Sequence, residues 1–269
     1  MTHPAETFRA LHVKGAPLVL VNVWDKGSAK MMQNMGAKAL ATSSAAHAFT
    51  MGRPDGGQIT RDEALAHAED IVSVTHLPVQ GDFENGFGDD PATCAETVRL
   101  SAEVGLAGIC IEDTVLPGNA AYDFDLAVER IRAAAVAAKE LTHDFVLTAR
   151  ADGILTGQYD TDEAIKRLQA FEAAGADCLY APLPPSLDDQ ARICAAVGAP
   201  VNALVAGRFC AHTLADFADI GVARVSLGSS LARITHRVMH DAAKAMFEDG
   251  QFSPLSAGIG SNVVDPLLK

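Results

Sequence analysis

Short hydrophobic runs rich in β-branched residues alternate with amphipathic stretches along most of the chain. Several runs are apolar at successive positions rather than at every second one, which is typical of strands covered on both faces. The runs predict eight strands: Leu18–Trp24, Ala39–Ser44, Val79–Glu84, Gly108–Asp113, Phe145–Asp152, Cys178–Pro182, Val201–Ala206 and Arg224–Ser229.

The amphipathic stretches between these runs predict helices that begin on capping residues. Thr60 and Glu63 have the spacing of a capping box, and Asp90 precedes a proline at the first helical position. The predicted helices are Thr60–Thr75, a helix that starts at Asp90, Asp123–Leu141, Asp160–Gly175, Ser186–Gly198 and Thr213–Gly221.

Strict alternation of strand and helix implies parallel strands joined by right-handed crossovers. Eight such units favour an α/β fold of the TIM (β/α)8 barrel type. An open doubly wound sheet is the alternative, but no G-x-G-x-x-G follows the first strand. We expect one domain over residues 1–269, with the barrel at about 18–250 and a loop-like tail at 251–269.

Composition narrows the possible partners. Of the 269 residues 49% are hydrophobic, and the formal net charge is −13. Nucleic acids and anionic membranes require a basic surface, so neither is expected as a partner. No apolar stretch is long enough to span a membrane, and we expect no secretory signal. The five cysteines form no C-x-x-C pair, which indicates buried thiols and a cytoplasmic location.

Polar residues at the predicted strand ends are the candidates for chemistry, because a TIM barrel carries its active site there. Asp82 and Glu84 stand two apart on one strand, so we expect their side chains to share a face. Glu112 ends the next strand. Three neighbouring carboxylates favour a bound divalent cation, and all-oxygen ligands indicate Mg²⁺, or Mn²⁺. The competing interpretation is a set of solvated loop acids and helix caps.

Arg150 follows a hydrophobic run, and a buried arginine needs anionic partners. Its partner is either a neighbouring acid, Asp152 or Glu112, or the carboxylate of a substrate, which a guanidinium can bind with two hydrogen bonds. The segment 45–59 is rich in glycine and predicts a long loop that contacts the substrate or forms a lid.

The constellation resembles the isocitrate lyase/phosphoenolpyruvate mutase superfamily over nearly the whole chain. The resemblance is carried by motifs at successive strand ends: Asn22-Val23-Trp24-Asp25, Thr42-Ser43-Ser44-Ala45, Gly52-Arg53-Pro54-Asp55-Gly56, Gly81-Asp82-Phe83-Glu84-Asn85-Gly86-Phe87-Gly88, Ile111-Glu112-Asp113 and Thr148-Ala149-Arg150. The resemblance implies a Mg²⁺-dependent barrel that acts on small 2-oxo or 2-hydroxy carboxylates. It also implies a homo-oligomer, a tetramer or a dimer, with C-terminal helices exchanged between subunits.

The resemblance also implies a role for each matching residue. Asp82, Glu84 and Glu112 hold the metal, some through water. Arg150, Asp55 and Glu112 are the implied catalytic residues. The implied substrate-binding residues are Trp24, Ser43, Ser44, Arg150, Asn119 and, on the seventh strand, Asn202.

The chain departs from the superfamily at the lid. Lyases carry K-[KR]-C-G-H after the fourth strand, whereas the segment here is Asp113-Thr114-Val115-Leu116-Pro117-Gly118-Asn119-Ala120-Ala121-Tyr122. It lacks the cysteine that acts as the acid, for which Tyr122 and His47 are possible replacements. Asn119 is a loose match to the asparagine of phosphonate-acting members.

Three functions follow. The first is a Mg²⁺-dependent lyase that cleaves a C–C bond, by retro-aldol reaction or decarboxylation, through an enolate-like anion. The second is a C–P mutase or hydrolase of the phosphonopyruvate type. The third is a barrel that binds a carboxylate without turnover.

Overall fold

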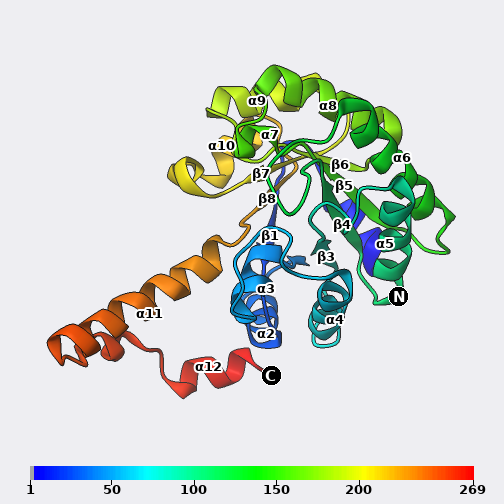
Figure 1. Ribbon diagram of the computed structural model, residues 1–269. Helices are drawn as coiled ribbons and strands as arrows, with labels where there is room; N and C mark the ends of the chain where they lie inside the picture. Colours follow the sequence, from blue (N-terminus) through cyan, green and yellow to red (C-terminus); the bar gives the residue numbers. More distant parts are fainter. Residues whose placement is uncertain (1–2) are drawn as a thin grey trace.

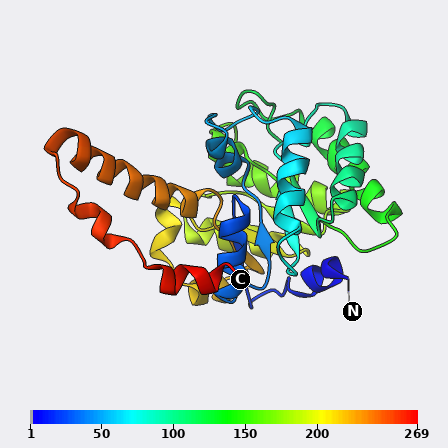
Figure 2. The same cartoon turned by 90° about the horizontal axis from the view of Figure 1, so that it is seen from below.

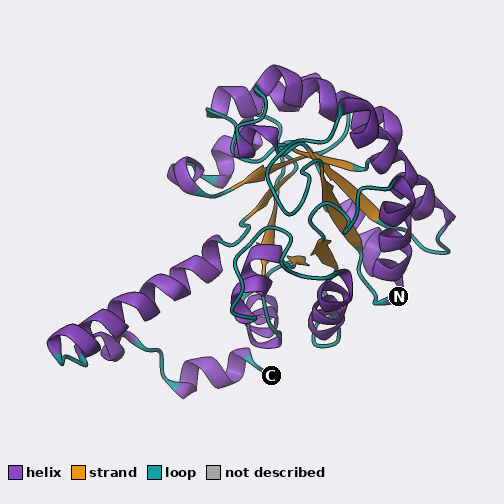
Figure 3. Cartoon of the chain, viewed as in Figure 1, coloured by secondary structure: helices purple, strands orange, loops and turns teal. Residues whose placement is uncertain are grey.

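The computed structural model describes residues 3–269 and confirms the predicted barrel. Eight parallel strands close in sequence order, with β1 paired to both β2 and β8 (Figures 1 and 3). The strands are β1 (Leu18–Asn22), β2 (Leu40–Ala41), β3 (Val79–Asp82), β4 (Gly108–Glu112), β5 (Val146–Arg150), β6 (Cys178–Tyr180), β7 (Val201–Leu204) and β8 (Arg224–Ser226).

Most of the helices cover the outside of the barrel, whereas the first lies across its N-terminal end and the last two extend away from it (Figures 1 and 2). The helices are α1 (Pro4–Ala10), α2 (Lys26–Asn34), α3 (Ser44–Thr50), α4 (Arg61–Val72), α5 (Pro91–Glu103), α6 (Phe124–Glu140), α7 (Gly153–Thr156), α8 (Thr161–Ala174), α9 (Leu187–Ala196), α10 (Leu214–Asp219), α11 (Ser230–Asp249) and α12 (Ser261–Leu267), with 3₁₀ turns η1 (Gly207–Ala211) and η2 (Ser253–Ala257). The predicted capping box at Thr60 and Glu63 is present at the start of α4.

Every predicted strand is present, but each is shorter at its C-terminal end than the hydrophobic run suggested. The residues lost from the strands belong to loops at the barrel rim. Two predicted loops contain helical structure, although 51–59 is a loop as predicted. The segment 45–59 begins with α3, which Ser43 caps by accepting a hydrogen bond from the Ala46 amide. The tail 251–269 contains η2 and α12 instead of being loop-like.

The two ends of the barrel are closed differently. At the N-terminal end, Ala5 and Phe8 of α1 pack against residues at the starts of the strands, including Leu18 and Cys178. At the C-terminal end the strands open into the polar loops that carry the candidate site. The bottom of the barrel is therefore sealed, whereas the top is accessible.

The C-terminal helices form an arm. In Figures 1 and 2, α11 projects away from the barrel and the chain then turns back through α12 toward α2. Lys30 Nζ and Asn34 Nδ2 of α2 donate hydrogen bonds to the carbonyls of Leu268 and Leu267. Across residues 3–269, no helix is both long enough and apolar enough to cross a membrane.

Candidate active site

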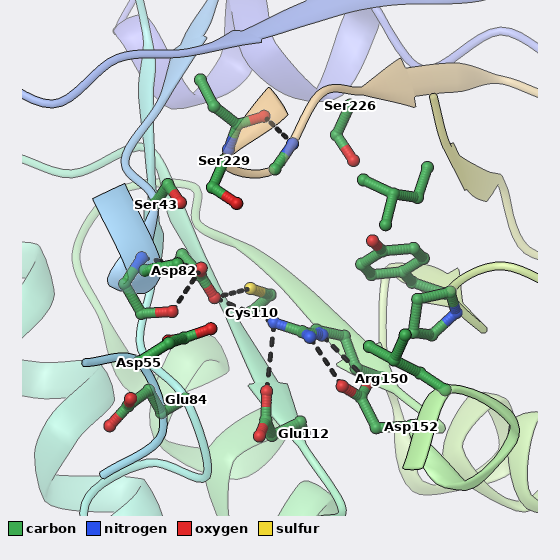
Figure 4. Close-up of a pocket in the computed structure, with 18 of the residues that line it drawn as sticks. Ser43, Asp55, Asp82, Glu84, Cys110, Glu112, Arg150, Asp152, Ser226 and Ser229 are labelled. Atoms are coloured by element: carbon green, nitrogen blue, oxygen red, sulfur yellow. Dashed lines mark hydrogen bonds and ion pairs between the residues drawn. The ribbon is translucent and has the colours of Figure 1, made fainter. Parts of the chain in front are cut away.

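A cavity of about 270 Å³ opens at the C-terminal ends of the strands and extends into the barrel (Figure 4). Its outer end is lined by side chains from the strand ends and the loops after them. These include Ser43, Ser44, Asp55, Asp82, Glu84, Glu112, Arg150 and Asp152. Its inner end is lined by Gln80, Cys110 and Arg224, which precede the last residues of β3, β4 and β8, together with Tyr180 and Ser226, which end β6 and β8.

Asp82, the last residue of β3, is held by donors from three elements. Its Oδ2 accepts hydrogen bonds from the backbone amide and the hydroxyl of Ser44, each at 2.9 Å. Its Oδ1 accepts one from Arg150 Nη1 at 2.9 Å and one from the Cys110 thiol at 3.3 Å. These contacts fix the carboxylate at the start of α3, where helix polarity also favours negative charge.

Arg150, the last residue of β5, lies among three carboxylates. Nη1 contacts Asp82 at 2.9 Å and Glu112 at 3.1 Å, while Nη2 contacts Asp152 at 2.6 Å. Glu112 reaches it because Glu112 and Arg150 are register partners on β4 and β5. Of the two alternatives for Arg150, pairing with a neighbouring acid is present with both Glu112 and Asp152, and Asp82 adds a third partner. Binding of a substrate carboxylate by Arg150 stays a prediction.

Glu84 corrects one expectation. It does not share a strand face with Asp82, because β3 ends at Asp82 and Glu84 has a φ of 45°. This left-handed conformation is costly for a residue other than glycine. It allows Glu84 Oε1 to accept a hydrogen bond from the Gly57 amide at 3.0 Å.

Burial and mutual repulsion act on the carboxyl groups of the outer end. Burial raises the pKa of Glu84 to about 7. It also raises the pKa of Glu112 well above its usual range, and Arg150 offsets this only in part. Burial and the charge of Asp82 raise the pKa of Asp55. When these carboxyls ionise, the outer end carries more negative charge than Arg150 can neutralise, so without a further cation burial keeps some of them protonated.

This donor set fits a hydrated divalent cation. The ligands are hard oxygens, and Mg²⁺ typically keeps several waters and takes only one or two carboxylates directly. Across residues 3–269, no three His, Cys, Asp or Glu side chains converge closely enough to enclose an ion by themselves. A metal among these carboxylates would therefore be held partly through water, with Arg150 contacting both Asp82 and Glu112.

Two loops meet over the outer end. The loop after α3 approaches the 113–122 segment at Gly57, where a Cβ atom would lie 3.2 Å from Leu116 and Pro117. Gly57 also has a φ of 72°, so both the close approach and the backbone favour glycine. A bridge between Thr114 and Ala121 closes the base of the 113–122 segment. Asp55, Leu116 and Gly118 of these loops line the cavity.

Three residues predicted to bind substrate lie outside the cavity wall. Trp24 is half-buried at the end of the β1 segment, where its carbonyl accepts from His67 and its amide donates to Ser28. Asn119 is exposed on the 113–122 segment. Asn202 is fully buried beneath the cavity, bonded to Ser226 and Arg224. Their roles in substrate binding therefore stay predictions, because the resemblance and strand position that suggested them do not place these side chains in the cavity wall.

The two candidate replacement acids also lie away from this cavity. His47 stacks on His67 with ring centroids 3.8 Å apart, and Tyr122 donates to Asp89. Sequence reasoning instead missed Cys110, Tyr180, Arg224 and Ser226. Period-two alternation could have found Cys110 and Tyr180, since Cys110 precedes Glu112 by two residues and Tyr180 pairs with Arg150.

The sequence matches the family model for phosphoenolpyruvate phosphomutase over residues 8–247. The chain belongs to the phosphoenolpyruvate phosphomutase family. This confirms the resemblance to the isocitrate lyase/phosphoenolpyruvate mutase superfamily.

Relatives within this family carry different names. An uncharacterized protein of Mycobacterium tuberculosis is 34% identical over 93% of this chain and 92% of its own. The 2-methylisocitrate lyase of Escherichia coli K12 is 35% identical over 66% of this chain and 61% of its own length. The oxaloacetate decarboxylase of Paraburkholderia xenovorans is 30% identical over 84% of this chain and 76% of its own.

Solved structures of the family share the fold. A lyase/mutase candidate from Burkholderia cenocepacia J2315 is 44% identical, with a TM-score of 0.92 over 98% of this chain and 94% of that one. A 2,3-dimethylmalate lyase is 25% identical, with a TM-score of 0.85 over 99% of this chain and 95% of that one.

Proposed function

We propose that this protein is a Mg²⁺-dependent lyase, active also with Mn²⁺, that cleaves a C–C bond in a small 2-oxo or 2-hydroxy carboxylic acid. The observation that carries the proposal is the excess of carboxylates around Arg150 at the outer end of the cavity. Relatives named 2-methylisocitrate lyase, oxaloacetate decarboxylase and 2,3-dimethylmalate lyase support C–C cleavage.

In this proposal Asp82, Glu84 and Glu112 hold the metal, some through water, and Asp55 supports the site. When bound, the metal supplies an electron sink for the negative charge that develops as the bond to C3 breaks. Ser44 and Arg150 orient Asp82 through the hydrogen bonds described above.

The remaining residues of the outer end contact the substrate. Arg150 donates three hydrogen bonds, two to Asp152 and one to Asp82, and its Nη1 also forms an ion pair with Glu112. A guanidinium has five N–H groups, so donors remain for a substrate carboxylate. Ser43 and Ser44 at the start of α3 present hydroxyls to the same space. The loops that meet at Gly57 exclude water and protect a carbanion from premature protonation.

The test is a coupled pyruvate assay with Mg²⁺ and with EDTA. The substrates are oxaloacetate, a methylisocitrate, a dimethylmalate and phosphonopyruvate, with an enzyme-free control for spontaneous decarboxylation. We expect EDTA-sensitive pyruvate from one of the C–C substrates. If none of the four gives pyruvate and a Mg²⁺-dependent ligand binds without product over hours, the protein is a carboxylate-binding barrel and the proposal is wrong.

C–P chemistry is the second candidate, because the matching family model is that of phosphoenolpyruvate phosphomutase. It predicts phosphate release from phosphonopyruvate, or its rearrangement, and loss of activity in Asn119→Ala. The exposed position of Asn119 disfavours it. A neutral Asn119→Ala variant together with pyruvate from a C–C substrate would exclude it.

We also propose that the arm mediates a homo-oligomer, a tetramer or a dimer, by exchange of C-terminal helices. Large apolar side chains are exposed along α11 and after it, including Met239 at 66% and Phe247 at 85% exposed. We expect light scattering to give a multimer that Met239→Glu with Phe247→Glu dissociates. Val136→Glu, at an exposed apolar position on α6, is the matched control and should leave the mass unchanged. A monomeric wild type would contradict this. We also propose that the protein is cytoplasmic, which cell fractionation followed by detection of the protein in each fraction would test.

A further inference from the structure

The inner end of the cavity contains a buried arginine that forms no ion pair with any carboxylate among residues 3–269. Arg224 begins β8 and is 1% exposed. Its Nε donates to Asn202 Oδ1 at 2.9 Å, and its Nη1 contacts Gln80 Oε1 at 2.6 Å and His12 Nε2 at 3.0 Å. All three partners are neutral groups. His12 donates from Nδ1 to the Phe8 carbonyl, so its Nε2 is the acceptor, and burial with the nearby Arg224 lowers the pKa of His12 to about 3.

The second terminal nitrogen of Arg224 faces the cavity. Within residues 3–269, Arg224 Nη2 makes no hydrogen bond. Among the same residues, Gln190 Oε1 is the only solvent-inaccessible side-chain nitrogen or oxygen that lacks a hydrogen-bond partner, so Nη2 is not solvent-inaccessible. Nη2 is therefore accessible, and the space that it reaches is the cavity that Arg224 lines. Arg130 is an instructive contrast. It is equally buried, but its Nη1 and Nη2 both bond to backbone carbonyls, and it does not line this cavity.

The neighbours of Arg224 use their acceptors on one another and leave donors toward the cavity. Gln80 Oε1 accepts from Arg224 and from Thr148, because an arginine can only donate. Ser226 Oγ accepts from Asn202 Nδ2 at 2.8 Å. Among the described residues, the amide nitrogen of Gln80 and the hydroxyls of Ser226 and Tyr180 donate to no protein group, and all three side chains line the cavity.

We propose that this inner end is an anion subsite in which Arg224 and Ser226 bind a carboxylate. Arg224 and Ser226 stand two apart on β8, so both side chains face the barrel interior, roughly 6–7 Å apart along the strand. Figure 4 shows Ser226 across the cavity from Asp82 and Arg150. Because a guanidinium and a hydroxyl offer several donors and no charged acceptor, the subsite selects a planar oxyanion over a cation or a neutral group.

The carboxylate has two possible sources. It belongs either to the far end of a dicarboxylic substrate, whose other end lies at the carboxylate-rich outer end, or to a separate small anion that fills the subsite. The first source rests on the proposed function, because it assumes that one substrate molecule spans the cavity that joins the two ends. The second does not depend on turnover.

Calorimetry separates these cases without turnover. Unbranched dicarboxylates from malonate to adipate, and their monomethyl esters, are titrated into the full-length protein with Mg²⁺ and with EDTA. We expect one diacid to bind more tightly than its ester, and Arg224→Gln to weaken that diacid by about 10- to 100-fold without weakening the ester. Arg224→Lys should retain part of the difference. A second titration uses formate as a probe for the subsite. If the diacid displaces formate, the subsite binds the carboxylate of the substrate; if formate binds together with the diacid, the subsite binds a separate anion.

Arg130→Gln is the matched control for loss of a buried arginine. It should lower the melting temperature but keep the ratio of diacid to ester affinity. If Arg224→Gln does not fold, Ser226→Ala replaces it, with an expected 3- to 10-fold loss for the diacid alone. The subsite is rejected if no diacid binds more tightly than its ester, or if the ratio survives in both variants. If the protein has lyase activity but the ratio of diacid to ester affinity does not change in the variants, only the subsite is rejected. If the ratio depends on Arg224 but the protein has no lyase activity, only the proposed function is rejected.

Discussion

Each end of the cavity contains an arginine that is largely or fully buried, Arg150 with 12% of its side chain exposed and Arg224 at 1%, but the two arginines have opposite surroundings. Arg150 at the outer end contacts three carboxylates, Asp82, Glu112 and Asp152. Arg224 at the inner end contacts only the neutral groups of Gln80, Asn202 and His12. The outer end therefore has surplus negative charge and the inner end surplus positive charge.

This difference shows that the role of a buried arginine depends on its acceptors. The neighbouring carboxylates neutralise the charge of Arg150, so the main role of Arg150 is to position these carboxylates around the proposed metal site. Amide and imidazole acceptors satisfy the geometry of Arg224 but leave its charge available. A cavity with one negative and one positive end would also orient an elongated ligand that carries a metal-binding group at one end and an anion at the other.

The largest expected effect comes from breaking the outer end at Asp82. Asp82→Ala should lower kcat by about 10³-fold, because it removes the residue that both orders the proposed metal site and is bound by Ser44 and Arg150. The measurement is steady-state turnover of the substrate identified by the pyruvate assay, at saturating Mg²⁺. Full turnover in both Asp82→Ala and Glu112→Gln would disprove the metal assignment.

Replacing each arginine in turn tests whether the two ends of the cavity differ in charge, through the change in the free energy of unfolding. Arg150→Met leaves three buried carboxylates without their cation, and we expect a loss of about 3–5 kcal/mol in the free energy of unfolding. Arg224→Met leaves only neutral acceptors unsatisfied, so about 1–3 kcal/mol is expected. Urea unfolding at pH 7.5 measures both. Acid or Mg²⁺ should restore part of the loss in Arg150→Met alone, and equal losses insensitive to both would contradict the assignment of charge.

Much of this comparison is outside the reach of sequence. Glu112 and Arg150 were predictable, because each ends a hydrophobic run and the strand ends of a barrel converge at one rim. Arg224 begins its strand, where a polar residue looks like the entry to the barrel. Its direction and its partners depend on pairing between β8, β7 and β1, which no local pattern encodes.

The loops show the same limit. The alternation of strand and helix predicted the barrel, but α3 was missed because it has only seven residues and Gly52 and Pro54 follow soon after its end. Glu84 was expected on a strand because it follows the hydrophobic run that starts at Val79, whereas its left-handed backbone directs its side chain to the Gly57 amide, 27 residues away in sequence. Such long-range contacts decide which strand-end residues line the cavity.

A smaller effect is expected from pH at the inner end. The pKa of His12 is about 3 in the folded protein, against an ordinary value of 6.5, so the unfolded chain binds more protons between these values. Stability from neutral His12 is complete above pH 6.5 and is lost as the pH falls toward 3. We expect a loss of at most about 2 kcal/mol between pH 6.5 and 5, which His12→Gln should lack. Urea unfolding of both proteins at these pH values measures the difference, and identical pH dependence would show that His12 is not held neutral.

The smallest effect, and the most specific, is expected from Ser226→Ala. Ser226 accepts from Asn202 and lines the inner end, while Ser43 at the outer end caps α3 and lines the same cavity. Loss of one hydroxyl should cost about 1 kcal/mol of binding wherever that hydroxyl contacts the ligand. Ser226→Ala should therefore weaken a diacid but not its ester, whereas Ser43→Ala should weaken both equally. Calorimetry on the two variants distinguishes the ends directly: a cavity that is uniform along its length would respond alike to both substitutions, and only a cavity with a separate anion subsite would not.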